Sequence, residues 1–195
     1  MLDFLCQPIR MSAANIDANT ILLRRATTDD ATAIAAIYAE HVRTSSACFD
    51  TIPRTVDETA DKIMEITGTG WPFLVALRGD FIAGYAYANQ FRDRPAYSFA
   101  CEDSIYVDAG FMGQGIGANL LRELIAAATA AGFRQMFAVI GGGEPASVAL
   151  HAKLGFEHAG RMRSVGRKFG RWLDTVYMQR PLGEGDRRDP EWEPG

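Results

Sequence analysis

The chain has 195 residues, of which 48% are hydrophobic and 23% are charged, and its formal net charge is −4. Length and composition are those of one soluble globular domain that can bury a sizeable core. The negative net charge and a pI near 5.4 exclude a general nucleic-acid-binding protein.

The cysteines Cys6, Cys48 and Cys101 are odd in number, widely spaced and without metal-ligand spacing. This usage indicates buried thiols in a reducing compartment, and we expect no metal site. No apolar run approaches the ~20 residues that span a membrane, and the N-terminus does not combine a basic region with a long apolar one. We therefore expect a cytoplasmic protein.

Three regions are predicted along the chain. Residues 1–19 show no sustained periodicity and are expected to be a poorly ordered N-terminal extension. Residues 20–182 carry the periodic segments and form the single folded domain. Residues 183–195 are charged and contain proline, so we expect this C-terminal tail to fray.

The first half of the domain shows both strand and helix patterns. A short strand is predicted over residues 20–25 and a helix to about residue 43, followed by a loop over residues 44–53. Thr55 and Glu58 then form a capping-box pattern that opens a second helix.

The remaining elements follow from periodicity and from glycine and proline positions. Strands are predicted over residues 73–77, 81–89, 97–107, 135–140, 156–162 and 175–180, helices after residue 117 and over residues 145–154, and a loop over residues 163–172. Short turns join the strands before residue 107, so these strands are expected to be antiparallel. The order predicts one mixed domain of the α+β or α/β class.

A glycine-rich turn lies at the centre of this pattern. The strand that ends at residues 105–107 runs into Gly113, Gly115 and Gly117, and an amphipathic helix begins directly after them. Glycines let the backbone approach a ligand closely, and the free amides of a helix start attract a phosphate. No lysine follows the last glycine, which excludes the loop of a nucleotide triphosphatase.

Two phosphate-binding motifs fit the turn. Gly113, Gly115 and Ala118 satisfy the dinucleotide fingerprint, which requires an acidic residue at the end of the next strand. That strand instead runs into a glycine triplet, and the first acid is Glu144, so the context of this motif fails. The other motif is the pyrophosphate loop of acyl-coenzyme A N-acyltransferases.

The chain resembles the GNAT superfamily, and within it the phosphinothricin acetyltransferase-like group. The segments that carry the resemblance are residues 101–107, 112–117, 146–156 and 166–174, and it extends from about Ile21 to Leu182. It implies a GNAT-type fold with a twisted, mostly antiparallel central sheet that is flanked by helices and splayed at its central strands. It also implies acetyl-CoA as cosubstrate and a homodimer.

The resemblance implies where acetyl-CoA binds. The coenzyme-binding residues would be Ile105, Tyr106, Val107, Met112, Gly113, Gln114, Gly115, Ile116, Gly117, Ala118, Glu144 and Ser147. Two of them depart from the family pattern. Met112 stands where the pattern has glutamine or arginine, and Glu144 stands where an asparagine is expected. A carboxylate near phosphates is repulsive, so Glu144 puts one contact in question.

The resemblance also assigns the chemistry. Glu102 would be the general base, and the backbone amide of Val107 or its neighbour would polarise the thioester carbonyl. His151 would protonate the departing thiolate. Two structural alternatives stay open: Glu102 in an ion pair with Arg92 or Arg94, and His151 bound to a backbone carbonyl.

Acceptor residues are expected on the loop and strand that precede Glu102 and in a second basic cluster over residues 166–171. Arginines offer paired donors for a carboxylate or phosphinate, and the candidates are Arg92, Arg94, Tyr97 and Lys168. We expect acetylation of the α-amine of a small amino-acid-like acceptor such as phosphinothricin, methionine sulfone or methionine sulfoximine. The alternatives are a protein N-terminal or lysine acetyltransferase of the same fold and a non-catalytic acyl-CoA sensor.

Overall fold

The computed structural model describes residues 20–192, so the predicted extension over residues 1–19 lies outside the described residues. The main elements are β1 (Ile21–Arg25), α1 (Ala31–Thr44), α2 (Val56–Gly68), β2 (Phe73–Arg78), β3 (Phe81–Gln90), β4 (Ala100–Val107), α3 (Ile116–Ala130), β5 (Gln135–Gly141), α4 (Pro145–Lys153), β6 (Glu157–Lys168) and β7 (Arg171–Pro181). Short 3-10 helices precede α1, β4 and the glycine-rich turn.

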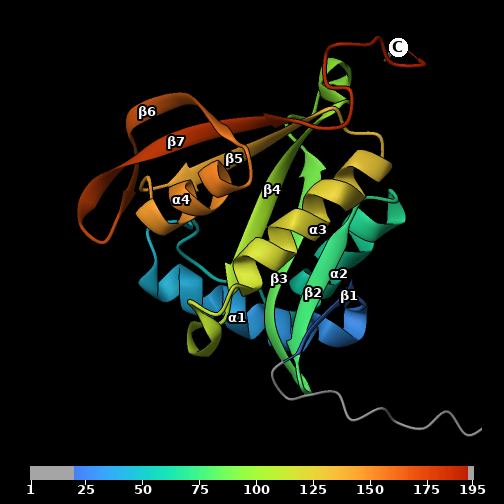
Figure 1. Cartoon of the computed structure of the whole chain (residues 1–195). Helices are drawn as coiled ribbons and strands as arrows, with labels where there is room; N and C mark the ends of the chain where they lie inside the picture. The colour runs from blue at the N-terminus through green and yellow to red at the C-terminus, as the bar shows by residue number, and fades with distance from the viewer. Residues whose placement is uncertain (1–19, 193–195) are drawn as a thin grey trace, which may run out of the picture.

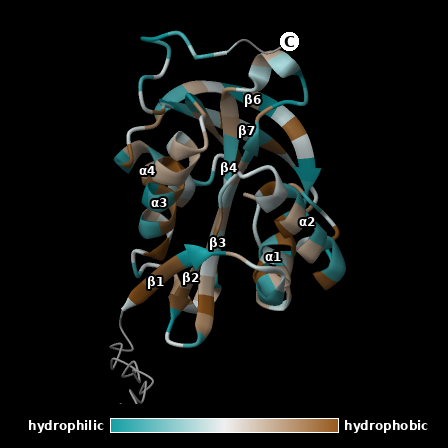
Figure 2. Cartoon of the chain, turned by 90° about the vertical axis from the view of Figure 1, so that its right-hand side faces the viewer, coloured by the Kyte–Doolittle hydropathy of each residue, from teal (hydrophilic) through white to brown (hydrophobic). Residues whose placement is uncertain are grey.

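The strands form one seven-stranded sheet in the order β1-β2-β3-β4-β5-β7-β6 (Figure 1). Neighbouring strands are antiparallel except β4 and β5, which pair in parallel. Helices α1 and α2 cover one face of the sheet, and α3 and α4 cover the other (Figure 2). The expected sheet of the GNAT type, mostly antiparallel and flanked by helices, is confirmed.

Each face of the sheet has its own hydrophobic core. On the α3 face, Leu120, Leu121 and Leu124 are fully buried against the small side chains of the central strands. On the other face, Ile34 and Ile63 are buried with the aromatic residues of β2 and β3. Because burying each such side chain contributes about 1.5–3 kcal/mol, the two layers fix the position of β4 between them.

The sheet divides between β4 and β5. Their pairing covers only Ala100–Asp103 of β4 and Gln135–Ala138 of β5. Beyond this point β4 stays paired with β3 as far as Val107, and β5 stays paired with β7 as far as Gly141. The last residues of β4 and β5 therefore have backbone groups that face a gap instead of each other.

Two predicted boundaries were wrong. Tyr97 lies on a 3-10 helix with Pro95 at its start, and β4 begins only at Ala100. The predicted loop over residues 163–172 is instead part of the β6–β7 hairpin, because β6 continues to Lys168 after a register shift between Met162 and Gly166. Proline fixes the backbone at the first site, and a bulge interrupts the strand pattern at the second.

Local contacts fix the start of α2 and one point of the segment after β7. The predicted capping box is present, since the Thr55 hydroxyl accepts from the Glu58 amide and the Glu58 carboxylate accepts from the Thr55 amide. After β7, the Trp192 ring lies 4.7 Å from that of Phe99, a contact that composition does not predict. The fraying of the rest of the tail stays a prediction. In residues 20–192, no helix has the length and apolarity to cross a membrane.

Candidate active site

The gap between β4 and β5 opens into a cleft of about 1030 Å³. Its walls come from α1, the α1–α2 loop (residues 45–55), β4, the glycine-rich turn, β5 and α4. The sequence-predicted residues that line it are Glu102, Ile105, Tyr106, Val107, Met112, Gly113, Gly115, Ile116, Gly117, Ala118, Glu144, Ser147 and His151. In the described part of the chain, no group of three or more His, Cys, Asp or Glu residues is arranged to hold a metal.

The glycine-rich turn presents backbone amides to the cleft. Gly113 and Gly115 have φ of 74° and 80°, a left-handed conformation that costs other residues energy. Gly115 is the N-cap of α3, and no side chain caps this helix start. The first amides of α3 are therefore available to an anion. Gln114 points elsewhere, because its side chain contacts Arg78 and the Gly110 carbonyl.

The end of β4 directs a backbone amide into the gap. The Asp108 amide donates to Ala83 on β3 over 3.0 Å, and backbone groups alternate in direction along a strand. The amide and carbonyl of Val107 therefore face away from β3. His41 on α1 donates from Nε2 to the Val107 carbonyl over 2.9 Å. This contact fixes the peptide group between Val107 and Asp108. That group directly follows the Val107 amide, which is predicted to polarise the thioester carbonyl.

Glu102 lies on β4 in the segment paired with β5, just before the gap opens. Its side chain is 28% exposed, and its Oε2 is 3.9 Å from Nη1 of Arg92. Burial and, to a lesser extent, the charge of Asp103 raise the pKa of Glu102, Arg92 lowers it, and the net result is a pKa of about 7. The ion pair with Arg92 is thus present, and burial outweighs its effect. A carboxylate with this pKa can accept a proton near neutral pH.

His151 is buried, with 3% of its surface exposed, and both of its ring nitrogens are in hydrogen bonds. Nδ1 is 2.7 Å from the Ser147 carbonyl, one turn earlier on α4. Nε2 is 3.0 Å from Oδ2 of Asp103, which is 7% exposed. Burial is the largest influence and lowers the pKa of His151, but the charge and hydrogen bond of Asp103 and the Ser147 carbonyl together raise it above its usual value.

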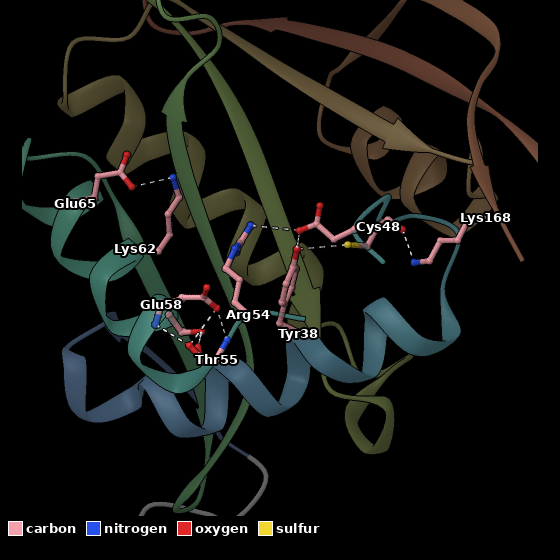
Figure 3. A network of polar contacts seen from close by, with 10 residues as sticks. Tyr38, Cys48, Arg54, Thr55, Glu58, Lys62, Glu65 and Lys168 are labelled. Atoms are coloured by element: carbon pink, nitrogen blue, oxygen red, sulfur yellow. Dashed lines mark hydrogen bonds and ion pairs between the residues drawn. The ribbon is translucent and has the colours of Figure 1, made fainter. Parts of the chain in front are cut away.

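The α1–α2 loop closes the cleft and is held from the far edge of the sheet. Lys168, near the end of β6, is 7% exposed and donates to the carbonyl oxygens of Ser45 and Cys48 over 3.0 and 2.7 Å. Figure 3 shows this side chain reaching the loop. Its ammonium therefore holds the loop, and its contact with an acceptor anion stays a prediction.

Phe49 seats the same loop against glycines of two strands. A Cβ atom at Gly166 would lie 2.3 Å from the Phe49 ring, and one at Gly141 would lie 2.7 Å from it. A Cβ atom at Gly142 would lie 2.8 Å from the Ser46 hydroxyl. The loop occupies the space that side chains at these three positions would need. A side chain at any of them would therefore displace the loop.

A polar cluster joins the loop to α1 in the wall of the cleft. The Tyr38 hydroxyl donates to Asp50, and the Arg54 guanidinium lies 4.4 Å from the Tyr38 ring and 3.8 Å from the Asp50 carboxylate (Figure 3). Tyr38 and Arg54 line the cleft, as does Tyr87 of β3. Burial, followed by the hydrogen bond to Asp50, raises the pKa of Tyr38 well above its usual value.

The other predicted acceptor residues lie outside the cleft in this structure. Arg92 stacks on the Phe91 ring at 4.0 Å, and the Tyr97 ring meets the same ring edge-on at 5.9 Å. Arg94 caps the 3-10 helix with its backbone, and its carbonyl accepts from the side chain of Gln90. Only Arg92 approaches Glu102. Their role toward an acceptor stays a prediction.

A family model for the acetyltransferase (GNAT) domain matches residues 23–177. The chain belongs to the GNAT acetyltransferase family. The matched residues include β4, the glycine-rich turn, Glu102 and His151, which are the parts that form the cleft of this GNAT domain.

Individual relatives support the phosphinothricin acetyltransferase-like group. A phosphinothricin N-acetyltransferase of Alcaligenes faecalis is 48% identical over 164 residues, covering 84% of this chain and 83% of the relative. An L-methionine sulfoximine/L-methionine sulfone acetyltransferase of Pseudomonas paraeruginosa is 37% identical, covering 80% and 92%. The structure of a Sinorhizobium meliloti phosphinothricin acetyltransferase in complex with AcCoA has a TM-score of 0.86 and 50% identity, covering 88% and 93%.

Sequence reasoning missed several residues of this GNAT cleft. Asp103, His41, Tyr38 and Arg54 all line it. The sequence does contain a signal for Asp103, which is an acidic residue directly after the predicted base. Neighbouring side chains in a strand point to opposite faces of the sheet, so Asp103 points away from Glu102. The others belong to α1 and its loop, and only the tertiary fold brings them to β4.

Proposed function

We propose that this GNAT protein transfers the acetyl group of acetyl-CoA to the α-amine of a small amino-acid-like acceptor. The observation that carries the proposal is the continuity of one cleft, which has the uncapped start of α3 at one end and Glu102 at the other. The two ends match the requirements of the two substrates. One offers amides to phosphates, and the other offers a carboxylate of raised pKa to an amine.

The coenzyme half of the proposal rests on the glycine-rich turn and the free edge of β4. Pyrophosphate would accept hydrogen bonds from the amides of Gly113, Gly115 and the first turn of α3. Pantetheine would lie along residues 105–107, where it replaces the missing strand pairing. Met112 and Glu144 both line this half, and we expect Glu144 to weaken phosphate binding in comparison with a neutral residue.

The chemical step is a direct attack. Glu102 takes a proton from the acceptor ammonium, and the freed amine forms a C–N bond with the thioester carbon. The amide of Val107 stabilises the charge that develops on the carbonyl oxygen. The C–S bond then breaks with its electron pair on sulfur, and His151 supplies the proton that this thiolate takes up.

The acceptor class is supported by charge and by relatives. The relatives named above act on phosphinothricin, methionine sulfoximine or methionine sulfone, which are amino acids with a second polar group. Arg54 offers a cation inside the cleft, and Arg92 approaches Glu102 from outside it. Arg94 and Tyr97 are included because they precede Glu102 in the sequence. We place the amine near Glu102 and the anionic groups near these donors.

Thiol release from acetyl-CoA tests this proposal against a panel of amines. The panel contains phosphinothricin, methionine sulfone, methionine sulfoximine, ordinary amino acids, polyamines and a lysine peptide. We expect turnover confined to the small amino-acid-like acceptors. Turnover of the peptide alone would favour a protein acetyltransferase, and coenzyme binding without any turnover would favour an acyl-CoA sensor.

We also propose that the enzyme acts as a homodimer. Large apolar side chains are exposed on the β6–β7 hairpin, namely Met162, Val165, Phe169 and Trp172, at 44–61% of their surface. Exposed apolar side chains that gather on one element are typical of an association surface. Light scattering in solution checks this, and a monomer at all concentrations would exclude it.

A further inference from the structure

The contacts of His151 determine how many protons its ring carries. The Ser147 carbonyl can only accept a hydrogen bond, so Nδ1, at 2.7 Å from it, must carry a hydrogen. Nε2 is 3.0 Å from Oδ2 of Asp103, and two lone pairs at this distance would repel each other. A proton must therefore lie between Nε2 and Oδ2 as well. The buried pair holds one proton more than a neutral histidine beside a carboxylate.

The basicity of the two groups places that proton on the histidine, because an imidazole binds a proton more tightly than a carboxylate does. In residues 20–192, Oδ1 of Asp103 is a buried oxygen without a hydrogen-bond partner. A buried carboxylate with an unpaired oxygen is costly unless a cation lies next to it. Asp103 also lies at the last residue pair that joins β4 to β5, which is the inner end of the gap.

The surroundings of the pair contain few other charges. The titratable neighbours on β4 are Cys101, whose pKa rises through burial and the charge of Asp103, and Glu102. The segment Gln135–Gly141 of β5 contains no ionisable side chain. The charged residues of α3 and α4, which are Arg122, Glu123 and Lys153, are exposed. The nearest groups that titrate are thus acids, which favour a protonated imidazole.

We propose that Asp103 is a positioning residue that keeps His151 doubly protonated, so that the imidazolium supplies the proton taken up by the leaving thiolate. This inference rests on the proposed function for its catalytic part only. As the C–S bond breaks, the electron pair goes to sulfur and the Nε2 proton moves to that sulfur. His151 is left neutral, with the Nε2 lone pair facing the Asp103 carboxylate, and the repulsion between them drives the pair to regain a proton from solvent after CoA leaves.

Asp103→Asn removes the charge and keeps the shape. The asparagine amide can donate to Nε2 of a neutral His151 while Nδ1 still donates to Ser147. A purely structural bridge between β4 and α4 is therefore preserved, and the extra proton is lost. Asp30→Asn is the matched control, because Asp30 is 6% exposed and hydrogen-bonded to Arg24, and it does not line the cleft.

Imidazole 15N NMR of the full-length protein near neutral pH reads the proton directly, without turnover. The sequence has three histidines, and the spectrum of His151→Gln assigns the signal. We expect both nitrogens of His151 protonated in the wild type and only Nδ1 protonated in Asp103→Asn. A singly protonated His151 in the wild type overturns the proposal, whatever the acceptor panel shows.

Steady-state kinetics test the catalytic part with whichever acceptor the panel identifies. We expect Asp103→Asn to lower kcat at least about tenfold, which is below the usual range of general-acid effects because a thiolate is a fair leaving group, with an unchanged acetyl-CoA KM. Asp30→Asn should leave kcat unchanged. A wild-type kcat in Asp103→Asn overturns the inference, as does a raised acetyl-CoA KM with unchanged kcat, which would mark a structural bridge.

Discussion

The ammonium of Lys168 lies 2.7 Å from the carbonyl oxygen of Cys48, although the two residues are 120 positions apart in the chain. Through this bond and the one to Ser45, the outermost strand of the sheet holds the loop that closes the cleft. The acceptor end of the site is thus shaped by an element that carries none of the proposed chemistry.

Replacing Lys168 by methionine should loosen that loop. The change keeps most of the length of the side chain and removes two hydrogen bonds from a charged donor, which costs about 3 kcal/mol of unfolding free energy. We expect the acceptor KM to rise roughly tenfold because the loop no longer positions the acceptor, with the acetyl-CoA KM unchanged. Arg167→Met, an exposed neighbour on β6, is the control and should leave both KM values unchanged.

Gly166→Ala should displace Phe49. The added Cβ would lie 2.3 Å from the ring, and overpacking of this kind costs about 1–3 kcal/mol. Thermal unfolding of Gly166→Ala and of Gly160→Ala measures the effect, because Gly160 is on the same strand and a Cβ there has open space. Adding Phe49→Ala should recover part of the loss. Equal stability of the two alanine variants would show that Phe49 does not occupy this space.

Glu102→Gln should remove the acidic limb of the pH–rate profile. With a pKa of about 7, the wild-type base is half protonated near neutrality, so kcat/KM for the acceptor should fall as pH drops below about 7. We expect Glu102→Gln to lower kcat about 100-fold and to lose that limb. Glu157→Gln, an exposed acid on β6, is the control. Retention of the limb in Glu102→Gln would assign it to another group.

The same carboxyl group should destabilise the fold at high pH. Its folded pKa is raised from 4.5 to about 7, so its stabilising contribution is present below about pH 4.5 and is lost as pH rises through 7. Glu102→Gln has no such loss. In denaturant unfolding, the free energy of unfolding of the variant should therefore rise by about 1–3 kcal/mol relative to that of the wild type between about pH 5 and pH 8. A constant difference across this range would contradict the raised pKa.

Gly115→Ala should affect the coenzyme and not the acceptor. An alanine at φ of 80° is strained by about 1–2 kcal/mol, although a Cβ there meets no atom within 4 Å. We expect relief of this strain to turn the first amides of α3 and to raise the acetyl-CoA KM, with the acceptor KM unchanged. Gly79→Ala is strained in the same way, with φ of 57° in the β2–β3 turn, and should lose stability without a change in either KM.

What could be predicted from the sequence was local. Gly113, Gly115 and the Thr55–Glu58 capping box are short-range patterns, and each lies where it was expected. The lining of the cleft by Glu102 and by residues 105–107 followed from the family resemblance, since a strand pattern alone does not show which edge of the strand is free.

What could not be predicted depends on contacts between distant segments. Asp103 and His151 are 48 positions apart, and neither position suggests that they share a proton. Lys168 was expected to bind an acceptor because it belongs to a basic cluster over residues 166–171, and such a cluster gives no sign that one of its members is buried. The length of β6 was underestimated because a bulge breaks the alternation of side chains that identifies a strand.

The division of the sheet has a consequence for how the chain avoids aggregation. Unpaired strand edges invite pairing with other chains, and soluble proteins usually protect them with charges, bulges or short outer strands. Here the ends of β4 and β5 are unpaired edges in the middle of the sheet, and helices cover both of its faces (Figure 2). A foreign strand would have to pass these helices to reach them. The unpaired backbone groups at the ends of β4 and β5 are thereby kept from pairing with neighbouring copies of the chain.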